Sequence, residues 1–460
     1  MKSLSIKSFN RNTLNVKHWF ADGVFRTIVR NASYLGSGKL VAALLGLVAL
    51  ACAGRGMTPG LFGTLVIIHS YANGVGALVK FQTWQFIVRY GTPALGRGDI
   101  DELRDVTGFA FGLDLASGLV GLVGGLALLP FLADWFDIPA EDVHLAMVYC
   151  LLIPTMTAAT PTGVLRVLDR FDQLALQQLV TPALRALGGV VSYFGNFGFI
   201  GFMITWFVAD LAGDVCLWIM SVIELRRRGI AGALRPGLIG PGRRLKTAWN
   251  FVWTTNIAHS IWAAWGPVSN LIVGAMLGPT SAGLFKIAAT FFDSASKPAD
   301  LMSRSFYPEI MRLDPASRHP WQLAIRSAFI SGGMGLLILL VVMVGGEPVI
   351  GLVFGKRYVE AYDLLQLMTA SLIVTMASFP LESLLYMAGR QRSALVSEGT
   401  AAAGYALLLF VLIHFFGITG AGLAYVAGVS LKALFMLLPT LWAYRERDML
   451  VSVMAPEAQA

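Results

Sequence analysis

Charged side chains are scarce in this sequence of 460 residues. Only 13% of the residues are charged, 56% are apolar, and the mean hydropathy is +0.67. Soluble domains average roughly 25% charged residues, so the sequence lacks much of the polar coat that a water-exposed surface needs. The length alone would suggest about three soluble domains, but we predict instead an all-α integral membrane protein.

Cysteine and the common catalytic motifs are also lacking. The three cysteines, Cys52, Cys150 and Cys216, lie in apolar stretches and suggest neither a disulfide framework nor a metal-ligand spacing. The sequence contains no Gly-x4-Gly-Lys-Ser/Thr, no Gly-x-Ser-x-Gly and no His-Glu-x-x-His. We therefore predict no cofactor, no metal, no ATP-hydrolysing domain and no enzymatic activity. Energy for transport would come from an ion gradient or from the gradient of the substrate itself.

Long apolar stretches fill most of the sequence. A helix that crosses roughly 30 Å of hydrocarbon needs about 20 mostly apolar residues. On this criterion we predict twelve spans, at 33–53, 60–88, 106–132, 143–164, 174–195, 198–222, 250–275, 282–304, 323–345, 360–386, 394–416 and 420–443. About thirty polar and basic residues precede the first of them, so we expect no cleavable signal peptide.

The basic residues form short clusters between the apolar stretches. Most of the 35 Lys and Arg fall on one side if the N-terminus is cytoplasmic, and the outer connections then hold only Arg55, Lys356 and Arg357. Lys and Arg concentrate in cytoplasmic loops of membrane proteins, so we predict that both termini lie inside. The net charge of +8 reflects this topology and does not predict a nucleic-acid partner.

The two halves of the sequence align at a shift of 220 residues. Gly54-x4-Pro59-x3-Gly63 matches Gly274-x4-Pro279-x3-Gly283. Six spans per half give both halves the same orientation, which is a parallel pseudo-twofold repeat of two six-helix lobes able to rock about a central cavity. We predict five segments: a basic amphipathic segment on the inner leaflet, the first lobe, a basic cytoplasmic linker, the second lobe and a cytoplasmic tail, at 1–32, 33–223, 224–249, 250–444 and 445–460.

Several local motifs resemble those of the polysaccharide flippases. Met57–Gly63 and Leu277–Gly283 look like the turn after the first helix of each lobe in that family. Gly163–Asp172 and Ala388–Arg392 are similar to the stretches that join the fourth and fifth helices of each lobe. The resemblance covers nearly the whole chain and points to the lipid-linked oligosaccharide flippases, within the multidrug/oligosaccharidyl-lipid/polysaccharide exporter superfamily.

This resemblance implies a V-shaped bundle in a bacterial inner membrane. It implies transport of an oligosaccharide on an undecaprenyl-diphosphate carrier from the cytoplasmic to the periplasmic leaflet, for exopolysaccharide, capsule or O-antigen synthesis. The expected partners are the lipid-linked oligosaccharide, membrane lipid, a polysaccharide polymerase and glycosyltransferases.

Basic side chains inside the spans are the candidate substrate ligands. A buried cation costs roughly 2.5–3.5 kcal/mol on insertion scales and usually faces a cavity or a partner. A lipid diphosphate crossing a low dielectric would be stabilised by such cations. The candidates are Lys39, Lys80, Arg185, His259, Lys286 and Lys297. Snorkelling to the interface is an alternative for Lys80 and Lys297, pairing with a carboxylate for Lys39, and ordinary packing for His259.

Intramembrane carboxylates are the candidate sites for a coupling ion. Asp210 and Asp214 are four residues apart and therefore share a helix face. They could bind a coupling proton or cation, or they could be structural partners of the buried cations.

Three other functions fit parts of the pattern. A multidrug exporter of the same superfamily would need an acidic cavity for cationic drugs. A membrane polymerase or ligase would need a sizeable outer loop with catalytic residues, whereas the largest predicted outer connection, 346–359, is short and mostly apolar. A scaffold without transport activity leaves the buried charges unexplained.

Overall fold

The computed structural model describes most of the chain. The described residues are 41–157, 159–230, 235–237, 248–297, 302–303, 306–307, 310–311, 313–314 and 317–454. Side chains at 248, 250–251, 254–255, 257–265 and 447–454 lie outside this description.

The described chain consists of helices and contains no strand. Its elements are Val41–Gly56, α3 (Pro59–Val79), α4 (Thr83–Phe86), the π-helix η2 (Ile87–Gly91), α5 (Thr92–Arg97), α6 (Ile100–Leu132), α7 (Ala140–Cys150), α8 (Ile153–Met156), α9 (Thr160–Val167), α10 (Phe171–Phe194), α11 (Gly198–Arg227), α13 (Ala248–Ala295), α15 (His319–Phe354), the 3-10 helix η3 (Lys356–Tyr358), α16 (Ala361–Met387) and α17 (Gln391–Met454). These elements confirm the predicted all-α class.

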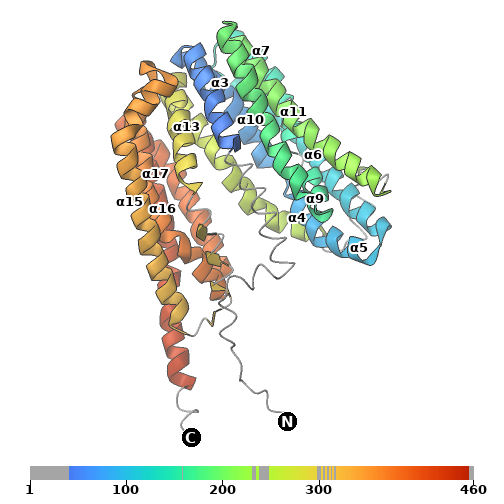
Figure 1. The fold of residues 1–460 in the computed structure, drawn as a ribbon, viewed down its shortest axis with the longest axis vertical. Helices are drawn as coiled ribbons and strands as arrows, with labels where there is room; N and C mark the ends of the chain where they lie inside the picture. Colours follow the sequence, from blue (N-terminus) through green and yellow to red (C-terminus); the bar gives the residue numbers. More distant parts are fainter. Residues whose placement is uncertain are drawn as a thin grey trace.

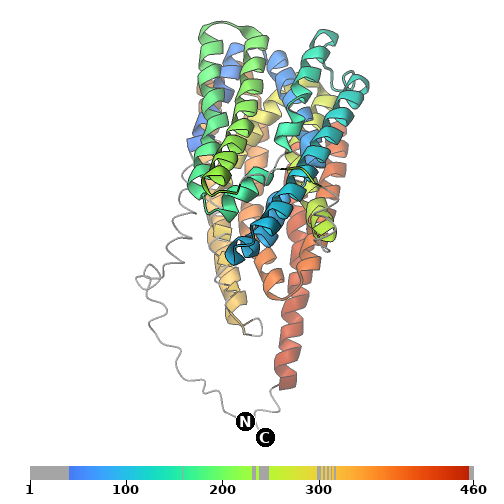
Figure 2. The ribbon, with the colours of Figure 1, turned by 90° about the vertical axis from the view of Figure 1, so that its right-hand side faces the viewer.

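The helices form two bundles (Figure 1). The elements up to α11 make the first bundle, and α13 to α17 make the second, except that the start of α13 packs against the first bundle through Trp253 on Phe81 and Trp249 on Phe109. The bundles meet near the end where α3, α7 and α13 are labelled, and they diverge toward the end that holds α5 and the last turns of α17. Figure 2 shows the same helices running side by side along the long axis.

Two of the longest helices fold back on themselves. Gly278 in α13 and Gly417 in α17 have positive φ and interrupt the helical backbone. In α17 the two arms are antiparallel, because the Ser397 hydroxyl donates to the Phe435 carbonyl and Lys432 donates to Glu398. Within the described residues eight helices are long and apolar enough to cross a membrane, or nine with the bent α7–α9 segment. The reversals divide α13 and α17 into two arms each. This arrangement is therefore consistent with the predicted twelve spans.

Two predicted spans of the first bundle are discontinuous. The span predicted at 60–88 breaks after α3, where Lys80 is extended, and the span predicted at 143–164 breaks between α8 and α9. The Asp114 carboxylate on α6 forms hydrogen bonds next to both breaks. It accepts from the Thr83 hydroxyl (2.8 Å) after the first break. It also accepts from the backbone N–H groups of Ala159 (2.8 Å) and Thr160 (2.7 Å) at the second. A carboxylate that caps α9 in this way has a structural role.

The repeated Gly-Pro motifs lie at the joint between the bundles. A Cβ on Gly63 of α3 would come 1.7 Å from the Pro279 carbonyl oxygen of α13, and a Cβ on Gly283 would come 3.4 Å from the Gly63 Cα. Residues that are equivalent in the repeat therefore touch each other. Only a residue without a side chain lets two helix backbones approach so closely.

Candidate substrate and ion site

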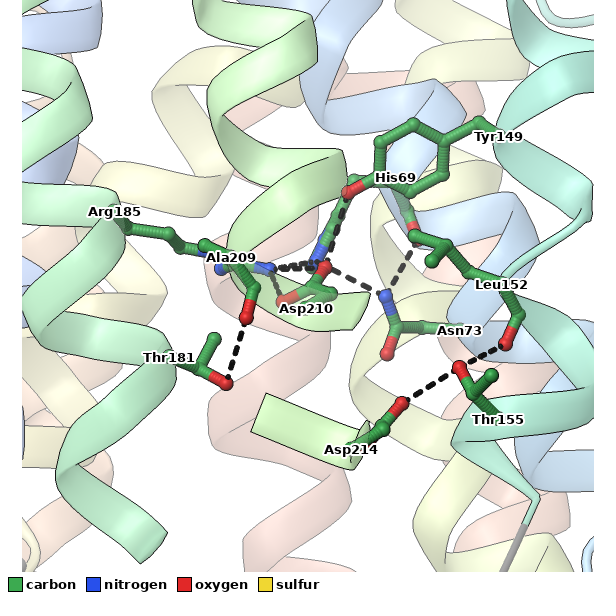
Figure 3. A network of polar contacts seen from close by, with 10 residues as sticks. All are labelled: His69, Asn73, Tyr149, Leu152, Thr155, Thr181, Arg185, Ala209, Asp210 and Asp214. Atoms are coloured by element: carbon green, nitrogen blue, oxygen red, sulfur yellow. Dashed lines mark hydrogen bonds and ion pairs between the residues drawn. The ribbon is translucent and has the colours of Figure 1, made fainter. Parts of the chain in front are cut away.

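A buried ion pair lies inside the first bundle (Figure 3). The Arg185 guanidinium on α10 donates to both carboxylate oxygens of Asp210 on α11, at 2.5 and 2.6 Å. Their side chains are 20% and 10% exposed. Both hydrogen bonds come from Nη2 of Arg185, and because this ion pair balances the two charges, Arg185 is not an isolated cation.

Three further side chains complete this network. His69 on α3 places Nε2 2.7 Å from the Arg185 guanidinium and 3.5 Å from Asp210. The Tyr149 hydroxyl on α7 donates to Asp210 at 3.1 Å. The Trp206 ring lies 4.7 Å beneath the Arg185 guanidinium, within the range of a cation–π contact. Four elements thus converge on one ion pair.

Sequence reasoning did not identify the three partners. His69, Tyr149 and Trp206 come from segments away from Arg185 in the sequence, and none belongs to a recognisable motif. The one signal in the sequence was the position of His69 inside the span predicted at 60–88. Ionisable groups inside membranes usually have partners.

Asp214 lies one helical turn beyond Asp210 in different surroundings. The Thr155 hydroxyl on α8 donates to it at 2.8 Å. The adjacent carbonyl, that of Met156, accepts from the Lys80 ammonium at 2.9 Å. Lys80 and Asp214 interact electrostatically, so consecutive residues of α8 hold a cation and a carboxylate at the break in the helix.

Lys286 brings a positive charge from the second bundle. It is partly buried on α13 and interacts electrostatically with Arg185 and His69 of the first bundle. The Asp293 carboxylate, two turns further along α13, attracts the positive charge of Lys286. In the described part of the chain Lys286 has no ion pair within 4 Å, so its charge is less fully balanced than that of Arg185.

The remaining predicted ligands lie elsewhere. Lys297, just beyond α13, is exposed. Lys39 lies outside the described residues, and the His259 side chain does too, although its backbone belongs to α13. The structure therefore pairs Arg185 with Asp210, places Lys80 near Asp214, and leaves the roles of all six predicted ligands as predictions.

Comparison with solved structures identifies the fold. The fold matches an inward-facing multidrug resistance MATE family transporter of the MOP superfamily with a TM-score of 0.70 and 14% identity, over 89% of this chain and 96% of that one. The outward-facing conformation of a MATE family transporter matches with a TM-score of 0.57 and 16% identity, over 93% and 96% of the two chains. A mutant of the Vibrio cholerae MATE transporter VcmN matches with a TM-score of 0.61 and 17% identity, over 92% and 97%. The chain thus has the two-bundle fold of these membrane transporters.

Sequence comparison places the chain within a family. Residues 94–363 match the family described as "Polysaccharide biosynthesis protein". The chain is 54% identical over 351 residues to "Inner membrane protein YghQ" of Escherichia coli strain K12, covering 76% of this chain and 99% of that relative. It belongs to the polysaccharide biosynthesis protein family, as the resemblance in its motifs predicted.

Proposed function

We propose that the chain is a flippase that moves an undecaprenyl-diphosphate-linked oligosaccharide from the cytoplasmic to the periplasmic leaflet by alternating access. The observation that carries this proposal is Lys286, a partly buried cation on α13 that forms no ion pair within 4 Å in the part of the chain that the structure describes, whereas Arg185 is paired with Asp210. A partly buried ammonium group without a paired carboxylate attracts an anion, and this attraction strengthens as water is excluded. A diphosphate headgroup is an anion of the required charge.

The two cations have different roles in this proposal. Arg185 is held in place by Asp210, and therefore supplies a fixed donor whose charge is largely balanced. Lys286 supplies the less balanced charge, so we expect it to contribute most to headgroup attraction. Lys80 would act as a second contact near the inner end, and Lys39, His259 and Lys297 remain further candidates.

The orientation of the bundles supports an inward-open state. The bundles diverge at the end that carries α5, whose last turn holds Arg97. If basic residues mark the cytoplasmic side, this end, which also holds the last turns of α17, is cytoplasmic. That both termini lie inside stays a prediction from the charges of the loops. The higher TM-score to the inward-facing transporter agrees with this orientation. The name of the Escherichia coli relative supports an inner-membrane location.

The two carboxylates differ as coupling sites. Asp210 is occupied by Arg185, His69 and Tyr149, whereas the hydrogen bond to Asp214 comes from one hydroxyl. We therefore favour Asp214 as the coupling-ion site. A proton suits it better than a metal cation, because the nearby Lys80 ammonium repels added positive charge.

The alternative function is a multidrug exporter. Two of the similar solved structures are multidrug resistance transporters, but at 14–17% identity this similarity shows the fold alone. The two functions differ in substrate charge: replacing Lys286 with alanine would weaken the binding of an anionic substrate and favour that of a cationic one.

Deleting the gene and locating the lipid-linked glycan tests the proposal. We expect the glycan to accumulate where a membrane-impermeant periplasmic glycosidase cannot reach it. Plasmid-borne wild type and a Lys356→Ala control should restore access, whereas Lys286→Ala and Lys39→Ala should restore it poorly at normal expression. Accumulation of the glycan on the periplasmic side in the deletion strain would overturn the proposal.

A further inference from the structure

A groove lies between the two arms of α17. Its walls are Arg392, Ser393, Val396, Ser397 and Thr400 from the first arm and Phe435, Leu438 and Pro439 from the second, and its volume is about 420 Å³. None of these residues belongs to the substrate and ion site described above.

Pro439 provides the physical reason for the groove. A proline inside a helix lacks an N–H group, and its ring displaces the carbonyl four residues earlier, which here is that of Phe435. The Ser397 hydroxyl on the opposite arm donates to this carbonyl at 2.8 Å. The Thr400 hydroxyl donates to the Val396 carbonyl of its own helix. Because both hydroxyls already donate hydrogen bonds within the protein, the lining of the groove is largely apolar.

Arg392 gives one end of the groove a positive charge. Two neighbouring cations are balanced, since Arg390 pairs with Glu446 at 2.5 Å and Lys432 pairs with Glu398 at 2.8 Å. Arg392 is exposed and forms no ion pair within the part of the chain that the structure describes. It lies in the first turn of α17, where the helix dipole adds to its attraction for an anion.

The size and surroundings of the groove identify its occupant. Arg392 and Thr400 are eight residues apart, about 12 Å along a helix, close to the depth of one leaflet in a hydrocarbon core of roughly 30 Å. Apolar side chains in and near the groove are exposed: Leu438 (56%) lines it, and Leu395 (54%) and Leu441 (50%) are close to lining residues in the sequence. Such a surface faces lipid chains, and the groove has room for one acyl chain below a headgroup, not for a whole lipid.

We propose that this groove binds one anionic phospholipid of the membrane. Its phosphate lies at Arg392 and the start of α17, and one acyl chain lies along Val396 against Phe435, Leu438 and Pro439. Occupancy would brace the two arms of α17 where the Pro439 interruption weakens them. This site is separate from the proposed transport path, so the inference does not depend on the flippase function.

Native mass spectrometry of the purified full-length protein tests the site. We expect phosphatidylglycerol to bind more tightly than phosphatidylcholine. Arg392→Gln should weaken phosphatidylglycerol binding about tenfold, as expected for the loss of one charged hydrogen-bonding contact. Val396→Trp, a change at a side chain that is 63% exposed, should fill the groove and remove both lipids.

The control is Arg445→Gln, which removes a nearby arginine that does not line the groove. Equal loss of phosphatidylglycerol in Arg445→Gln and Arg392→Gln would contradict the proposal, since it would indicate general surface charge. Unchanged binding in folded Val396→Trp protein would also overturn it. Displacement of phosphatidylglycerol by undecaprenyl phosphate at equal concentration would contradict the choice of a phospholipid as occupant.

Discussion

At the residue scale, the Arg185–Asp210 pair allows the first bundle to bury two charged side chains. Both side chains are largely buried, so removing one partner leaves the other as an unbalanced charge. That loss typically costs about 3–5 kcal/mol. We expect Arg185→Met and Asp210→Asn each to lower the melting temperature of the purified protein markedly, as measured by differential scanning fluorimetry.

The double variant separates pairing from a simple loss of packing. Arg185→Met combined with Asp210→Asn should be more stable than the sum of the two single effects predicts, because no unpaired charge remains. Strict additivity in this cycle would show that the two groups are independent.

The sequence revealed which buried charges exist but not how they are paired. Arg185, Asp210 and Lys286 stand out because a charge inside an apolar stretch is costly. Their partners could not be predicted, since His69 and Tyr149 reach the site through tertiary packing. For the same reason Asp114 could not be recognised from sequence as the carboxylate that holds two helix breaks.

At the element scale, the packing of α3 against α13 depends on Gly63. A Cβ there would come 1.7 Å from the Pro279 carbonyl, whereas a Cβ on Gly60 of the same helix would meet its nearest atom, Thr280 Oγ1, at 3.9 Å. Overpacking typically costs about 1–3 kcal/mol. We expect Gly63→Ala to lower the melting temperature and Gly60→Ala to leave it unchanged or slightly higher. Equal melting temperatures for the two variants would show that α3 and α13 can move apart at Gly63 without loss of stability.

The helices were more predictable than their interruptions. Spans predicted at 198–222 and 360–386 correspond to α11 and α16, because long apolar runs specify membrane helices directly. The breaks at Lys80 and before Thr160 could not be foreseen. They depend on backbone groups being satisfied by Lys80 and Asp114, which local sequence does not reveal.

At the scale of the whole molecule, Arg55 links the two bundles at the end where they meet. Its Nε donates to the Val353 carbonyl at 2.9 Å, and its guanidinium also donates to the Leu352 carbonyl. Both carbonyls belong to the last turn of α15, where no later residue of the helix can bond to them. Arg55 therefore stabilises the state in which the bundles are closed at this end.

Removing this link should shift the conformational equilibrium. We expect Arg55→Gln to raise the population of molecules open at this end about tenfold, as the loss of about 1.4 kcal/mol requires. Double electron–electron resonance distances between spin labels at Phe194 and Phe416, both exposed, would measure the change in a background without the three native cysteines. Lys356→Gln is the matched control, and an unchanged distance distribution in Arg55→Gln would show that Arg55 does not hold the bundles together.

The repeat predicted two similar lobes, but it could not predict which ends touch. The Gly-Pro motifs were visible at a spacing of 220 residues, and only the structure shows that the two copies contact each other across the bundles. The divergence of the bundles at the other end leads to the inward-open interpretation and hence to the proposed transport cycle.

The most direct test of this account is transport by purified protein in proteoliposomes. The measured quantity is the rate at which a fluorescent undecaprenyl-diphosphate oligosaccharide in one leaflet becomes accessible to a quencher on the opposite side. We predict rapid movement with wild type and Lys356→Ala, and at least about tenfold slower movement with Lys286→Ala, as expected for the loss of one charged contact. No movement with correctly folded wild type, or equal rates with Lys286→Ala, would contradict the account.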